Sequence, residues 1–132
     1  MSSAASLAHR SPIQPGRAAL IALWVVQIAL AGMFLLAGGS KLLGASAMVA
    51  LFDAIGIGQW FRYLTGLIEV GSALALLMPA FAVFGALTLV PTMIGAIATQ
   101  LFIVGGSPVP PAVLLLGAAI VVMARRHELV KA

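Results

Sequence analysis

A carboxylate lies in the middle of one of the most apolar stretches of this chain. The segment GLIEVGSALALL, residues 66–77, has Glu69 as its only charged residue. If this segment crosses a lipid bilayer as a helix, a charge near its centre costs at least about 2.5–3.5 kcal/mol. Protonation or a partner of opposite charge would lower that cost. Glu69 is therefore a candidate proton-active carboxyl, ligand contact or half of a buried ion pair. The alternative is a structural hydrogen bond between helices.

Two basic residues are candidate partners for Glu69. Arg62 lies on the same helical face as Glu69, two turns earlier, within a polar and small-residue stripe. Lys41 ends the first apolar run and can either bend inward toward Glu69 or extend to the lipid headgroups. It shares a helical face with four earlier residues, Gln27, Ala31, Phe34 and Gly38. The sequence leaves the choice between Lys41 and Arg62 open.

Gln100 is the one strongly polar side chain deep in the third apolar run. It either completes a polar cluster with Glu69 or bonds to a neighbouring backbone. The same run carries a stripe of small and hydroxylic residues, which predicts a packing face with hydroxyls bonding across to another helix. The stripe consists of Gly85, Thr88, Thr92, Gly95 and Thr99.

Several kinds of chemistry are excluded by residue type. The chain has no cysteine, which excludes disulfides, thiol exchange and cysteine-ligated metals. His9 and His127 lie outside the apolar runs, so we expect no metal site and no intramembrane haem held by this chain. No nucleophile–base pair is present. Catalytic residues are therefore unassigned, and the balance is against an enzyme in the isolated chain.

The composition predicts a membrane protein. Of the 132 residues, 63% are hydrophobic and 8% are charged, whereas soluble domains carry about 25% charged residues. The net charge is +4, but the basic residues sit mostly at the ends of the apolar runs. Such residues orient a membrane protein and contact anionic headgroups. The expected partner is therefore a lipid bilayer and not nucleic acid.

The apolar runs predict an all-α integral membrane four-helix bundle. Spans are expected at residues 18–38, 63–78, 81–104 and 112–124. Between the first two, residues 46–55 predict a short interfacial amphipathic helix, with Ser46 as its N-cap and Gly56 at its end. The predicted division is a flexible tail at 1–17, a transmembrane domain at 18–124 and a basic tail at 125–132.

Four spans place both termini on one side of the membrane. The basic residues expected on that side are Arg10, Arg17, Arg125, Arg126 and Lys131, and those on the other side are Lys41 and Arg62. This asymmetry favours cytoplasmic termini.

Three short motifs, in this order and spacing, resemble the DoxX-like family of small bacterial membrane proteins. They are Gly-x-x-Lys-Leu at residues 38–42, an aromatic-x-x-hydrophobic-Gly loop at 52–56, and Gly-x-x-Glu at 66–69. The resemblance covers roughly residues 20–124. It implies a four-helix bundle in the bacterial inner membrane, with Lys41 and Glu69 as the family's polar pair. Some relatives carry a histidine at the place of Gln100, and this departure weakens a redox or metal role here.

Three functions are open to such a protein. Relatives are tied to thiosulfate:quinone oxidoreductase subunits and to a membrane-associated oxidoreductase complex that handles oxidative and thiol stress. The first hypothesis is thus an accessory subunit that docks a soluble or membrane oxidoreductase, or that binds a quinone near Lys41, Glu69 and Gln100. The alternatives are a non-catalytic assembly factor or scaffold and a small proton-coupled exporter. The ligand, the partner and any homo-oligomer are left open.

Overall fold

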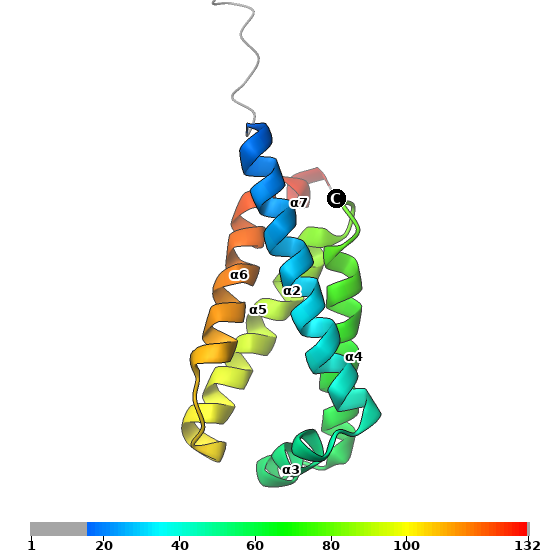
Figure 1. The fold of residues 1–132 in the computed structure, drawn as a ribbon, viewed down its shortest axis with the longest axis vertical. Helices are drawn as coiled ribbons and strands as arrows, with labels where there is room; N and C mark the ends of the chain where they lie inside the picture. The colour runs from blue at the N-terminus through cyan, green and yellow to red at the C-terminus, as the bar shows by residue number, and fades with distance from the viewer. Residues whose placement is uncertain (1–15, 132) are drawn as a thin grey trace, which may run out of the picture.

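The computed structural model describes residues 16–131, and all secondary structure in this range is helical (Figure 1). The helices are α2 (Arg17–Leu43), α3 (Ser46–Ile55), α4 (Gln59–Leu76), α5 (Ala82–Thr99), the π-helix η1 (Gln100–Val104), α6 (Val109–Arg125) and α7 (His127–Lys131). The all-α prediction is confirmed. Residues 1–15 of the expected flexible tail lie outside the described residues.

The four longer helices pack in a closed order. α2 packs against α4, α4 against α5, α5 against α6, and α6 against α2. Their common core contains Leu30, Phe34, Leu76, Leu89 and Val121, all buried. The start of α2 and helix α7 lie at one end of the molecule, and α3 crosses the other end (Figure 1).

The outer surface of these helices is apolar. Leu36 is 71% exposed, Leu116 is 63% exposed, and many other large hydrophobic side chains are also exposed. Meanwhile Gln27, Arg62 and Glu69 are buried. Two helical stretches, Arg17–Leu43 and Ala82–Val104, are long and apolar enough to cross a membrane. An apolar exterior around polar interior groups is the pattern that lipid, not water, stabilises.

The ends of α3 correct one detail of the sequence analysis. The helix spans the predicted residues, and Gly56 follows it in the left-handed conformation with φ 83°. Ser46, however, is not the N-cap, because Ala45 occupies that position without a side-chain hydrogen bond. The preceding Gly44 also has a positive φ of 72° and ends α2. The chain therefore turns at glycine on both sides of α3.

The stripe of small residues on α5 is not a packing face, apart from Gly85. Thr88 is exposed, and its hydroxyl donates to the Phe84 carbonyl of its own helix at 2.9 Å. Thr92 and Thr99 likewise donate to the carbonyls four residues earlier. Because a threonine hydroxyl can be satisfied within its helix, it needs no partner across the interface. The buried face of α5 consists of Ala82, Val83, Gly85, Ala86, Leu89 and Met93.

α2 and α4 approach most closely at two glycines. A Cβ atom added to Gly38 would lie 2.9 Å from the Gly66 carbonyl oxygen and 2.8 Å from a methyl of Val70. A Cβ atom on Gly66 would lie 3.0 Å from the Gly38 carbonyl oxygen. Only glycine allows two helix backbones to come this near. Lys41 and Glu69 follow these glycines by three residues each, so the crossing places both next to the interface.

We expect Gly38→Ala to destabilise the protein, whereas Gly32→Ala on the same helix leaves it unchanged or slightly more stable. The first methyl meets backbone that cannot move without separating the helices, which costs about 1–3 kcal/mol. The second meets nothing within 4 Å. Unfolding of the detergent-solubilised variants by denaturant checks this. Equal stability of the two variants would contradict the close helix crossing.

Candidate functional site

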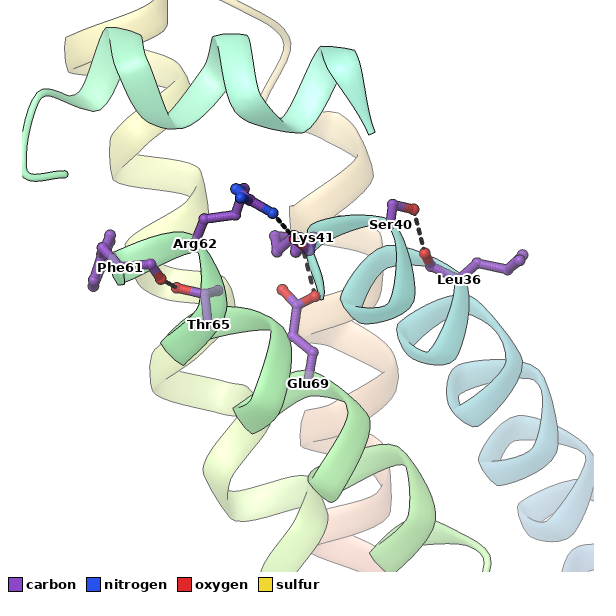
Figure 2. A network of polar contacts seen from close by, with 7 residues as sticks. All are labelled: Leu36, Ser40, Lys41, Phe61, Arg62, Thr65 and Glu69. Atoms are coloured by element: carbon purple, nitrogen blue, oxygen red, sulfur yellow. Dashed lines mark hydrogen bonds and ion pairs between the residues drawn. The ribbon is translucent and has the colours of Figure 1, made fainter. Parts of the chain in front are cut away.

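Glu69 forms an ion pair with Lys41 at the crossing of α2 and α4 (Figure 2). The Lys41 Nζ lies 3.0 Å from the Glu69 Oε2, and the side chains are 11% and 3% exposed, respectively. Lys41 therefore bends inward and does not extend to the surface. A buried charge is tolerated when its partner and its hydrogen bond come together, and this contact supplies both.

Arg62 has a different role from the one considered for it. Its Nη1 donates to the Lys41 carbonyl at the end of α2 (Figure 2). Its Nε donates to the Gln59 Oε1 at 2.7 Å. The guanidinium also lies 4.3 Å from the centre of the Tyr63 ring. The last carbonyls of a helix lack partners within it, and the helix dipole favours a cation there. Arg62 thus caps α2, the helix that carries Lys41.

A cavity of about 530 Å³ lies beside the ion pair. Its polar lining consists of Lys41, Thr65, Glu69, Thr92, Thr99 and Gln100, and the remaining lining is apolar. Lys41 and Glu69 belong to α2 and α4, whereas Gln100 is the first residue of η1. The structure thus brings three of the four candidate residues to one cavity, and Arg62 lies outside its lining.

Gln100 contacts the cavity without bonding to Glu69. The side-chain hydrogen bonds of Glu69 in the described part of the chain go to Lys41 alone. The Gln100 Oε1 lies against the backbone of Gly106, where an added Cβ atom would be 2.1 Å away. Gln100 also begins a π-helical turn, a geometry often found at functional sites. Gln100 thus lies in the cavity lining at the start of this turn.

A second polar cluster at the opposite end of the molecule was missed by the sequence analysis. The Gln27 Nε2 donates to the Leu76 carbonyl at 2.8 Å, and the Arg125 Nε donates to the Gln27 Oε1 at 2.6 Å. Arg125 also pairs with Glu128 at 2.8 Å. Gln27 was placed on the same face of its helix as Lys41, but Arg125 was assigned to a tail. The available signal was an arginine directly after the last apolar run.

The charges and the lining of the cavity decide which kind of molecule it can bind. The ion pair is neutral as a whole, and the surrounding lining is apolar, so a neutral apolar molecule fits best. An ammonium group has three donors, and the Lys41 ammonium donates to Glu69, so it can also donate to a carbonyl oxygen. Among residues 16–131, no group of three His, Asp or Glu side chains could hold a metal ion.

We expect the effects of Lys41→Met and Glu69→Gln on stability to be strongly non-additive. Each single variant leaves a buried group without its partner, which costs about 3–5 kcal/mol. The double variant removes both charges and should lose little more than one single variant. Denaturant unfolding of the four proteins gives the coupling free energy. Ser72→Ala, a buried change one turn from Glu69, is the control. Additive losses would show that the two residues are not paired.

Comparison with known proteins relates the chain to a family. No curated protein and no solved structure matches the chain. The model of the DoxX-like family matches residues 25–124, which include both Lys41 and Glu69. Together with the apolar helices, this match indicates a membrane protein. Because the match covers most of the 132 residues, the chain belongs to the DoxX-like family.

Proposed function

We propose that α2, α4, α5 and α6 form a four-helix bundle that spans the bacterial inner membrane, with both termini in the cytoplasm. The basic residues support this orientation. Arg17, Arg125 and Arg126 belong to the end where α2 begins and α6 ends, and Lys41 and Arg62 to the end crossed by α3 (Figure 1). α3 then lies at the outward-facing surface of the inner membrane, opposite the cytoplasm.

Within this bundle, the protein acts as an accessory subunit of a membrane-associated redox system and binds a quinone. The observation that carries this proposal is the cavity beside the Lys41–Glu69 pair. A quinone is an uncharged ring with two carbonyl acceptors, which suits an apolar cavity with an ammonium donor. Gln100 offers a second donor in the same lining. The quinone would supply the electron-accepting chemistry.

The residues of this chain would bind and orient the quinone. Lys41 would donate to one carbonyl oxygen, and Glu69 would keep Lys41 in place and take part in moving a proton. The chain has no cysteine, so thiol chemistry would come from a partner oxidoreductase. The chain would thus provide the membrane site, and the partner would provide the electrons.

A scaffold is the second candidate function, and the pairing of the polar groups favours it. In the described residues, no buried side-chain nitrogen or oxygen lacks a hydrogen-bond partner. Polar groups that are fully hydrogen-bonded to one another need no ligand, and holding helices together is a sufficient role for them. The decision between the two functions rests on whether a molecule binds in the cavity.

We expect a decyl-substituted benzoquinone to raise the Tm of the detergent-solubilised protein. A ligand that binds the folded state alone stabilises it by about 2.7 kcal/mol at a hundred times its Kd. Lys41→Met should abolish this shift, whatever its own Tm, because it removes the ammonium donor. Glu69→Gln should weaken the shift, because Lys41 then loses the carboxylate that keeps it in place. Ser72→Ala lies outside the cavity lining and should retain it.

Two outcomes would count against the quinone site. A Tm shift of the same size in all variants would place the quinone elsewhere, for example in the detergent. No shift in the wild-type protein, together with destabilisation in both charge variants, would favour the scaffold.

A further inference from the structure

The short helix α3 covers the cavity. Its apolar face lines the cavity through Met48, Leu51, Phe52 and Ile55. α3 packs against α4 on one side and against η1 on the other, so it bridges two elements that bound the cavity. Figure 2 shows α3 crossing above the polar site. α3 thus forms one wall of the cavity at this end.

The turns at both ends of α3 contain glycines with positive φ angles. Gly44 precedes it with φ 72°, and Gly56 and Gly58 follow it with φ 83° and 121°. Glycine adopts such angles without the steric strain that other residues meet. The ten-residue helix is thus joined to α2 and α4 by short glycine-containing turns and not by continuous helix. Such turns can absorb large changes in backbone angle when an element moves.

Among the described residues, the side chain of Gln59 holds α3 to α4 by hydrogen bonds. The Gln59 Nε2 donates to the Val49 carbonyl at 3.1 Å and to the Asp53 Oδ1 at 2.8 Å, both on α3. The Gln59 Oε1 accepts from the Arg62 Nε at 2.7 Å. Both amide hydrogens and the amide oxygen are therefore in use.

The contacts of Gln59 continue to the ion pair. Arg62 donates to the carbonyl of Lys41, and the ammonium of Lys41 pairs with Glu69. Gln59 is thus bonded directly to α3 and, through Arg62, to the end of α2 that carries Lys41. Gln59 itself is not among the residues that line the cavity, and it contacts neither the Lys41 ammonium nor the Glu69 carboxylate.

We propose that Gln59 is the positioning residue of this site: it holds α3 closed over the cavity, and a ligand passes when these bonds open and α3 swings about its terminal glycines. That a ligand passes rests on the function proposed above. The movement of α3 itself does not, and it can be measured without any ligand.

The hydrogen-bond pattern gives a selective variant. In Gln59→Glu the carboxylate still accepts from Arg62, but it faces the Val49 carbonyl and the Asp53 carboxylate with no donor. The contact to α3 becomes repulsive, while the contact to Arg62 is kept or strengthened. Adding Asp53→Asn supplies an amide donor toward Glu at position 59 and restores one bond to α3. The double variant is therefore a rescue.

Gln27→Glu is a matched control at the other end of the molecule. Gln27 also accepts from an arginine Nε and donates to a backbone carbonyl, with distances of 2.6 and 2.8 Å. The same substitution thus disturbs a similar hydrogen-bond arrangement that does not touch α3, in a more deeply buried place. Any general effect of introducing the carboxylate appears in both variants.

The experiment measures access to the cavity through a single cysteine. Since the natural chain has none, Ala96→Cys on the cavity lining becomes the one thiol in the protein. Its rate of reaction with a maleimide in detergent micelles is then compared across the variants. We expect Gln59→Glu to raise this rate by at least about tenfold, because both hydrogen bonds to α3 are lost and a single one is worth up to about that factor. Asp53→Asn should return it toward the starting value, and Gln27→Glu should leave it unchanged.

A cysteine at the exposed Ala98 of the same helix reports the intrinsic reactivity of the thiol, and its rate should be constant throughout. The proposal is overturned if Ala96→Cys reacts at the same rate with and without Gln59→Glu. It is also overturned if Gln27→Glu accelerates the reaction as much as Gln59→Glu does.

Ligand kinetics separate this proposal from the proposed function. The decyl-substituted benzoquinone quenches tryptophan fluorescence, so stopped-flow mixing gives its association and dissociation rates. We expect Gln59→Glu to accelerate both rates by a similar factor and to leave Kd nearly unchanged. Unchanged association and dissociation rates would overturn the proposal that α3 controls access to the cavity. A thiol rate that responds to Gln59→Glu in a protein that binds no quinone would support the movement of α3 and reject the quinone site.

Discussion

The close crossing of α2 and α4 sets the position of the polar groups in the candidate site. The backbones meet at Gly38 and Gly66, where neither position has room for a side chain. One turn beyond this contact on each helix, Lys41 and Glu69 face each other at 3.0 Å. A buried carboxylate in an apolar surrounding must find its partner within the protein. A wider crossing would separate the pair and leave two uncompensated charges.

α2 and α4 are joined in two places by the same kind of hydrogen bond, from a side chain of one helix to a carbonyl in the last turn of the other. At one end, Arg62 of α4 donates to the Lys41 carbonyl in the last turn of α2. At the other end, Gln27 of α2 donates to the Leu76 carbonyl in the last turn of α4, supported by Arg125. Carbonyls at helix ends have no partner within the helix, and lipid offers none. Each helix therefore supplies the cap of the other.

The cavity exists because helix packing is incomplete on one side of this pair. The hydroxyls of Thr92 and Thr99 are satisfied within α5, so they can face an open space without needing a partner helix. The short helix α3 covers this space with apolar side chains, and its polar contacts lie on the outer side at Gln59. The close polar crossing of α2 and α4 thus adjoins a short helix that Gln59 holds by two hydrogen bonds.

The sequence by itself determined the helices and the inner faces of α2 and α4. Hydrophobic runs fix the length of a helix, and a spacing of three and four residues fixes which side chains share a face. This sufficed to expect Glu69 inside the bundle, to place Gln27 and Lys41 on one face of α2, and to find α3. Only the tertiary structure decided that Lys41, not Arg62, pairs with Glu69, and that Gln27 meets Arg125. These choices depend on the distance and relative height of helices far apart in the chain, which no local pattern of residues records.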